Sequence, residues 1–290
     1  MKLCFAGLGI MGAPMAGHLV KAGYKVTGFN RSHQKALDWA KEYGMHAEAT
    51  LGTALMGAQV LILCVGRDED VRQTVLNAIS HMKPGSLIID HTTTSAKLSR
   101  EMVALCAEKH ITFYDAPVSG GQAGAVNGQL SIMVGGDAAR YAEVVELTRP
   151  YTKSITHLGE AGAGQMAKMA NQIAIAGAVQ GVAEALHFTK CAGLDPELVF
   201  SAISAGAAGS WQMSNRWATM AKDEYDFGFA VDWMRKDLGI ALDEARANGA
   251  HLSVAALVDQ FYSEVQSMGG RRWDTSSLHA RLEARRQKRK

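Results

Sequence analysis

Short apolar runs alternate with helix-like stretches through the first half of the chain. The runs are apolar on both faces of a strand, and their alternation with helices is typical of a largely parallel sheet that is covered on both sides. The pattern therefore predicts a doubly wound α/β fold with a mostly parallel sheet. The predicted strands are 3–6, 24–29, 60–65, 86–90, 111–116 and 130–135, and the predicted helices are 13–20, 34–43, 68–76, 95–108 and 138–147.

The second half of the chain changes character at about residue 162. A long, alanine-rich apolar helix is predicted at 166–189, and no further strand pattern follows it. We therefore expect two domains, a dinucleotide-binding domain at 1–162 and an all-helical domain at 163–290 that begins with the long helix. The later predicted helices are 196–204, 211–221, 229–247, 254–267 and 276–286.

A glycine-rich turn joins the first predicted strand to the first predicted helix, as in a Rossmann-type domain. In such a turn the first glycine permits a tight bend, the second lets the backbone approach a pyrophosphate, and the third allows close packing of helix and strand. The amides and positive dipole of the new helix then face two phosphates. A glycine turn without a ligand is the alternative. The expected cofactor contacts are Gly7, Gly9, Ile10, Met11 and Gly12.

The end of the second predicted strand indicates which dinucleotide binds. NAD-specific proteins of this fold usually carry an acidic residue there, whose charge repels a 2′-phosphate. This chain has Asn30, Arg31 and Ser32, which are two neutral hydrogen-bonding groups and a planar cation that can pair with phosphate. We therefore expect NADP(H) to be preferred over NAD(H). The structural alternative is a solvated arginine beside a serine that caps the helix 34–43.

Charge and hydropathy exclude several classes of partner. The 290-residue chain has a net charge of +2 with acids and bases interspersed, so no broad cationic face indicates nucleic acid or a membrane surface. No apolar run approaches the length of a membrane span, and the first strand leaves no room for a signal peptide, so we expect a cytoplasmic protein. A solvated basic helix end is expected at Arg281, Arg285, Arg286, Lys288, Arg289 and Lys290.

The four cysteines give no sign of a metal site. Cys4, Cys64, Cys106 and Cys191 are far apart in the chain and lack the spacing of metal ligands. We expect them to be small buried residues in a reducing compartment.

The turn after the strand 111–116 offers an anion site. Ser119 carries a hydroxyl, and Gly120 and Gly121 expose backbone N–H groups with no side chain in the way. Together these groups can form a nest for the carboxylate of a substrate. An ordinary glycine turn is the alternative.

Two predicted helices carry charges that need an explanation. Lys168 lies in the apolar helix 166–189, with Asn171 and Gln172 on the same face. A lysine there is costly unless it has a function or extends its amine to solvent, and the helical pattern alone favours solvent. Lys236 and Asp237 are adjacent, which is typical of a surface ion pair. With the cofactor turn and the anion nest, however, Lys168 completes the groups that a hydride-transfer enzyme for a small hydroxy acid needs.

Over essentially its full length the chain resembles the β-hydroxyacid dehydrogenases, a family that includes 3-hydroxyisobutyrate dehydrogenases and several semialdehyde reductases. The resemblance implies an NAD(P)-dependent oxidoreductase that interconverts a small β-hydroxy acid and its semialdehyde, and a homodimer or homotetramer. The segments that carry it are GLGIMGAPMA at 7–16, DAPVSGG at 115–121, GAGQMAKMANQ at 162–172 and KDLGIAL at 236–242.

The resemblance also implies a role for each matched residue. Lys168 is expected to take the hydroxyl proton during oxidation and to return it during reduction. A pKa of about 10.4 is too high for an efficient base, but burial and the cationic nicotinamide disfavour the ammonium form. The expected substrate contacts are Ser119, Gly120, Gly121, Asn171 or Gln172 and Trp211, and further cofactor contacts are Val65, Thr93 and Lys236.

Some features depart from the family pattern or leave alternatives open. Many relatives have Leu-Pro after the residue that corresponds to Cys64, whereas this chain has Val65 and Gly66. Trp211 can line the pocket or belong to an interface core. An imine-reducing enzyme of the same fold is the first alternative function, but such proteins generally lack the lysine at position 168. A dinucleotide-binding module without activity is the second.

Overall fold

The computed structural model describes residues 1–287, and the described chain divides into two compact units. The first is Met1–Lys168 and the second extends from Met169 onward. The division falls inside helix α8 (Ala163–Cys191), after its first six residues. The predicted boundary at 162/163 lies at the beginning of this helix. The observed boundary lies later, so the start of α8 belongs to the first unit.

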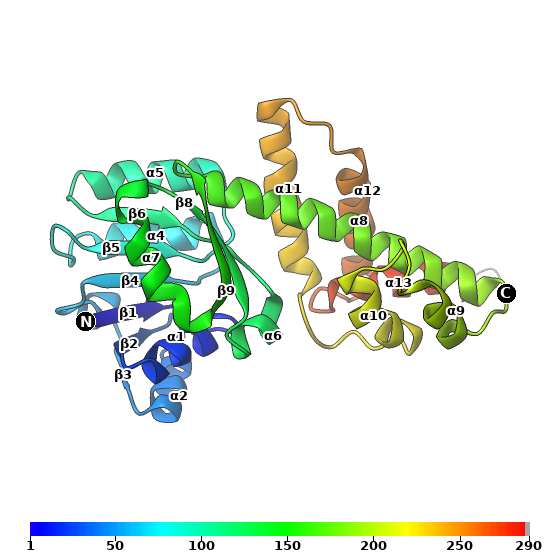
Figure 1. The fold of residues 1–290 in the computed structure, drawn as a ribbon, viewed down its shortest axis with the longest axis horizontal. Helices are drawn as coiled ribbons and strands as arrows, with labels where there is room; N and C mark the ends of the chain where they lie inside the picture. Colours follow the sequence, from blue (N-terminus) through cyan, green and yellow to red (C-terminus); the bar gives the residue numbers. More distant parts are fainter. Residues whose placement is uncertain (288–290) are drawn as a thin grey trace. The chain divides into compact units, whose positions relative to one another are not determined.

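The first unit is built on one twisted sheet (Figure 1). Its strands lie in the order β3-β2-β1-β4-β5-β6-β8-β7, with β9 paired to β8. Pairing is parallel from β3 to β6, antiparallel where β8 meets β6 and β7, and parallel again between β8 and β9. The strands are β1 (Lys2–Ala6), β2 (Lys25–Phe29), β3 (His46–Ala47), β4 (Val60–Leu63), β5 (Leu87–Asp90), β6 (Thr112–Asp115), β7 (Val118–Ser119), β8 (Leu130–Gly135) and β9 (Thr152–Gly159).

Apolar cores cover both faces of this sheet. Leu3 and Phe5 of β1 point into a core with α1 and α2, whereas Cys4 and Ala6 point into a second core with α4 and α5. This alternation makes the sheet the central layer of a doubly wound fold, as predicted. The helices are α1 (Gly12–Lys21), α2 (His33–Tyr43), α3 (Leu51–Ala54), α4 (Asp68–Ala78), α5 (Ala96–Ala107), α6 (Gly121–Val126) and α7 (Tyr141–Thr148), with short 3₁₀ turns at Ala138–Arg140 and Arg149–Tyr151.

The second unit is helical around a core of its own. Val182 and Leu186 of α8 pack there with Trp217, Leu238 and Val258 from the later helices. Among the described residues, no helix is long and apolar enough to cross a membrane. The helices after α8 are α9 (Pro196–Ile203), α10 (Trp211–Ala221), α11 (Val231–Asn248), α12 (Ser253–Ser267) and α13 (Leu278–Gln287), with a 3₁₀ turn at Thr275–Ser277.

Several sequence predictions need correction. Strand β9 was not predicted, because most of its side chains are exposed or half-buried and no apolar run marks it. Cys191 is exposed and Cys64 is only partly buried, so the expectation of four buried cysteines was wrong. In the predicted basic helix end, Arg281 is buried against the Phe261 ring rather than solvated, and Lys288, Arg289 and Lys290 lie outside the described residues.

Candidate active site

The glycine-rich turn lies between β1 and α1, where the strand order reverses between β1 and β4. A Cβ on Gly7 would lie 2.1 Å from the carbonyl oxygen of Cys64, and one on Gly12 would lie 1.8 Å from that of Gly7. The protein's own backbone therefore requires both glycines. A Cβ on Gly9 would have no described heavy atom within 4 Å, so the space beside Gly9 is open to a ligand.

The beginning of α1 suits an anion. Ile10 is exposed just before the helix, and Met11 occupies the N-cap position. The Met11 side chain makes no capping hydrogen bond to α1, and the first turn of the helix holds no acidic residue. Unsatisfied amides and a positive dipole end favour phosphate at such a terminus. The turn therefore fits a dinucleotide pyrophosphate on the protein's own geometry.

The segment after β2 is hydrogen-bonded to this turn through Asn30 and carries the exposed cation of Arg31. Asn30 Oδ1 accepts a hydrogen bond from the Leu8 amide at 3.0 Å, and Asn30 Nδ2 donates to the Ser32 carbonyl at 3.0 Å. Arg31 is 92% exposed and pairs with Asp70 at 3.2 Å. Ser32 occupies the N-cap position of α2, but within the described chain its side chain makes no capping bond, so the alternative of a side-chain cap by this serine was wrong.

The predicted anion nest has the expected backbone. Ser119 ends β7 and is half-buried, and α6 begins two residues later at Gly121. Gly120 has φ of 131° and Gly121 has φ of 60°, which are conformations that favour glycine. A Cβ on Gly121 would meet no described heavy atom within 4 Å. Gly120 and Gly121 are both exposed, so an anion can approach this turn, as a nest requires.

Lys168 is a buried side chain of α8. The residue is 8% exposed, which contradicts the interpretation of a lysine exposed to solvent. The start of α8 is held by Asp115, which accepts hydrogen bonds from the amides of Gly162 at 2.7 Å and Gln165 at 2.9 Å. Burial raises the pKa of Asp115, and these amide hydrogen bonds oppose the rise.

The segment after β5 is tied to the same helix. Gln165 donates to the carbonyl oxygen of Thr92 at 2.8 Å and accepts from the amide of Thr94 at 3.0 Å. Thr92 also accepts from the amide of Val65 at 3.0 Å, which links the end of β4 to this segment. Thr93, a predicted cofactor contact, lies between the two threonines that Gln165 contacts.

In the second unit, polar side chains of α8 and α11 form a chain of contacts. Asn171 donates to Gln172 Oε1 at 2.8 Å, and Gln172 donates to Asp237 Oδ2 at 2.7 Å. The other oxygen of Asp237 lies 3.2 Å from the Lys236 ammonium, and Asp237 is 2% exposed. Lys236 and Asp237 thus form the expected ion pair, but the expectation that it lies at the surface was wrong, because the carboxylate is buried. Gln172 is buried as well, whereas Asn171 is half-buried.

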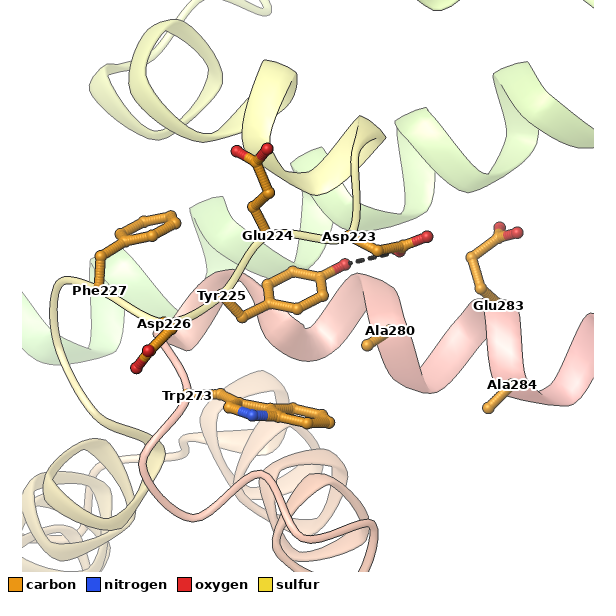
Figure 2. Close-up of a pocket in the computed structure, with 9 residues that line it drawn as sticks. All are labelled: Asp223, Glu224, Tyr225, Asp226, Phe227, Trp273, Ala280, Glu283 and Ala284. Atoms are coloured by element: carbon orange, nitrogen blue, oxygen red, sulfur yellow. Dashed lines mark hydrogen bonds between the residues drawn. The ribbon is translucent and has the colours of Figure 1, made fainter.

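Two features of the second unit stand apart from these contacts. Trp211 is 58% exposed at the start of α10, and the Arg216 guanidinium lies 4.9 Å from its ring centre. A hollow with acidic and aromatic walls contains none of the predicted site residues (Figure 2). It is lined by Asp223, Glu224, Tyr225, Asp226, Phe227, Trp273, Ala280, Glu283 and Ala284.

The sequence did not predict the contacts made by Asp115, Thr92, Gln165 and Asp237. Asp115 and Gln165 lie inside matched segments, but their hydrogen bonds join positions far apart in the chain. Within the described residues, no group of three or more His, Cys, Asp or Glu side chains could hold a metal ion.

Comparison with known proteins decides the family. Residues 2–159 match the NAD binding domain of 6-phosphogluconate dehydrogenase, and residues 162–282 match the NAD-binding region of NADP-dependent 3-hydroxyisobutyrate dehydrogenase. The chain belongs to the β-hydroxyacid dehydrogenase family. As a β-hydroxyacid dehydrogenase it is an NAD(P)-dependent oxidoreductase that acts on CH–OH groups.

Relatives of this β-hydroxyacid dehydrogenase cover nearly its whole length. An uncharacterized oxidoreductase of Shewanella frigidimarina is 58% identical over 97% of this chain and 98% of its own. The NAD-dependent L-serine dehydrogenase of Pseudomonas aeruginosa is 33% identical over 92% of this chain and 93% of its own. The structure of 3-hydroxyisobutyrate dehydrogenase from Mycobacterium tuberculosis, solved with L-serine, has a TM-score of 0.88 and 31% identity, and covers 97% of this chain and 98% of its own.

Proposed function

We propose that this enzyme interconverts a small β-hydroxy acid and its semialdehyde with NADP(H), and that Lys168 is the general acid and base. The observation that carries the proposal is the burial of the Lys168 side chain on a helix whose start is anchored to the ends of β5 and β6. Ligands of doubly wound sheets bind at these carboxyl ends of the strands. A buried lysine at that edge is suited to proton transfer rather than to solubility.

The residues of the site divide the remaining work. The amides of Gly120 and Gly121, with the Ser119 hydroxyl, would hold the substrate carboxylate. Asn171 or Gln172 would orient the substrate; Asn171 is half-buried, whereas Gln172 is buried. Lys168 would take the hydroxyl proton in oxidation and supply it in reduction.

The cofactor residues would hold the dinucleotide beside this lysine. The turn from Gly7 to Gly12 would bind the pyrophosphate, and Val65 would contact the adenosine side of the cofactor. Thr93 and Lys236 would contact the nicotinamide end. The bound dinucleotide supplies or accepts the hydride.

NADP(H) is the proposed cofactor because Arg31 stands where an NAD-specific fold carries an acid. One relative is named as NAD-dependent, and the C-terminal match is described as NADP-dependent, so relatives use both. We expect Arg31→Ala to lower kcat/KM for NADPH at least tenfold while kcat/KM for NADH stays within twofold. Equal losses with both cofactors would contradict a contact with the 2′-phosphate.

The lysine assignment is tested by Lys168→Ala. Because general acid–base catalysis contributes roughly 10²–10⁴-fold, we expect kcat to fall by at least 100-fold while the Kd for NADPH, measured by fluorescence, stays within twofold. The substrates for reduction are glyoxylate and the semialdehydes of succinate, tartronate and methylmalonate. The substrates for oxidation are L-serine and 3-hydroxyisobutyrate. Near-normal turnover of Lys168→Ala would refute the assignment, and no turnover of any of these substrates by the unmodified enzyme would refute the substrate class.

A further inference from the structure

Asp115 caps the beginning of α8 from another element. It is the last residue of β6 and is fully buried, and its two oxygens accept the amides of Gly162 and Gln165. A Cβ on Gly135 would lie 2.6 Å from Oδ1, and one on Gly164 would lie 2.9 Å from Oδ2. The two glycines thus leave the space that the carboxylate needs beside the start of α8, and its charge suits the positive end of the α8 dipole.

Gln165, in the first turn of α8, connects the helix to the sheet a second time. Its side chain is fully buried, and its two polar ends contact the backbone before and after Thr93. The amide oxygen and amide nitrogen thus each have a partner of opposite polarity on the β5 side of the sheet. Asp115 ties α8 to β6, and Gln165 ties the same turn to the segment after β5.

Both connections lie close to Lys168 on the helix. Lys168 follows Gln165 by three residues, which places the two on the same face and about 4.5 Å apart along the axis. Gln165 contacts the residues on both sides of Thr93, so it couples the helix of the proposed acid–base to a proposed cofactor contact. A shift of this turn would change the distance between the amine and the nicotinamide.

We propose that Asp115 and Gln165 are positioning residues, which fix the Lys168 amine relative to the reacting atoms. The proposal rests on the proposed function of Lys168. A displacement of about 1 Å can lower a rate 100-fold without loss of binding, because proton and hydride transfer require near-contact geometry. The two residues thus act on kcat through Lys168 and leave the Kd for NADPH to the glycine-rich turn.

The experiment compares two variants with a matched control. Gln165→Met keeps the approximate size of the side chain and removes both hydrogen bonds, and Asp115→Asn places an NH₂ group against a backbone amide. We expect each to lower kcat about 100-fold, to shift the pH–rate profile by at least one pH unit, and to leave the Kd for NADPH within twofold. The control is Thr148→Val, which removes a buried hydrogen bond to Val144 within α7.

The outcomes separate this proposal from the function on which it rests. The control should lose thermal stability but keep its kcat and pH profile. If Gln165→Met loses stability like the control and keeps kcat and the profile, the positioning role is refuted, whether or not Asp115→Asn folds. If Lys168→Ala is inactive in that same series, the acid–base role of Lys168 is supported even though the positioning role is refuted. Turnover by Lys168→Ala would overturn both.

Discussion

His91 should make the stability of the first unit depend on pH between about 6.5 and about 4. The side chain is buried after β5, where Nδ1 lies 2.6 Å from the Ala116 carbonyl oxygen and Nε2 lies 2.9 Å from the Tyr151 hydroxyl. A carbonyl only accepts, so Nδ1 carries the proton of the neutral ring and Nε2 accepts from the tyrosine. Burial lowers the pKa of His91 from 6.5 to about 4, and the bond to Ala116 opposes the fall.

The sign and size of the effect follow from this pKa. Because the folded protein favours the neutral ring, its stabilisation is complete above pH 6.5 and is lost as the pH falls to about 4. At about 1.4 kcal/mol for each pH unit, the loss amounts to about 3 kcal/mol in the free energy of unfolding.

The assay compares the unmodified protein with His91→Gln, whose side chain does not titrate. Urea unfolding at pH 7 and pH 4 should show that the unmodified protein loses about 3 kcal/mol more than the variant over this range. Nitrogen chemical shifts of labelled histidine should show the Nδ1–H tautomer at pH 7. Equal pH dependence of the two proteins, or a His91 that titrates near 6.5, would refute the reasoning.

Three further predictions concern other parts of the first unit and one exposed thiol. Gly9→Ala should keep its melting temperature and bind NADPH at least tenfold more weakly. Gly12→Ala should in addition lose folded protein, because a Cβ at position 12 meets backbone and one at position 9 does not. Circular dichroism measures the folded protein, and a fluorescence titration measures NADPH binding. Ser95→Ala should lower the free energy of unfolding by about 1–2 kcal/mol in urea titrations, because Ser95 Oγ accepts the Leu98 amide and also donates to a carboxylate. Iodoacetamide at pH 8 should label the exposed Cys191 first and leave Cys4 unlabelled in the folded protein, because burial raises the pKa of Cys4 to about 12; mass spectrometry of peptides decides.

The sequence predicted those parts of the fold that local patterns control. Helix α10 has the predicted bounds, and strands β4 and β5 lie within the predicted apolar runs. The glycine-rich turn was predictable because its steric demands are local: Gly7 and Gly12 lie too close to backbone for any side chain. Strand β9 was not predictable, because a half-exposed strand paired only with β8 has no apolar run.

The candidate site shows the same division between local and distant determinants. Lys168 and the Ser119 turn were predicted as site residues from short motifs. The burial of Asp237 was missed because its partner Gln172 comes from a helix 65 positions earlier in the chain. The anchors Asp115 and Gln165 were missed for the same reason, since spacing within a motif does not reveal which distant amide a side chain contacts.

The buried Asp237 carboxylate determines the direction of the two hydrogen bonds that connect it through Gln172 to Asn171. A carboxylate only accepts, so Gln172 must turn its NH₂ group toward Asp237 and its oxygen toward Asn171. Asn171 in turn must offer its own NH₂ group. One negative charge thus orders two amides that X-ray maps at ordinary resolution could not orient.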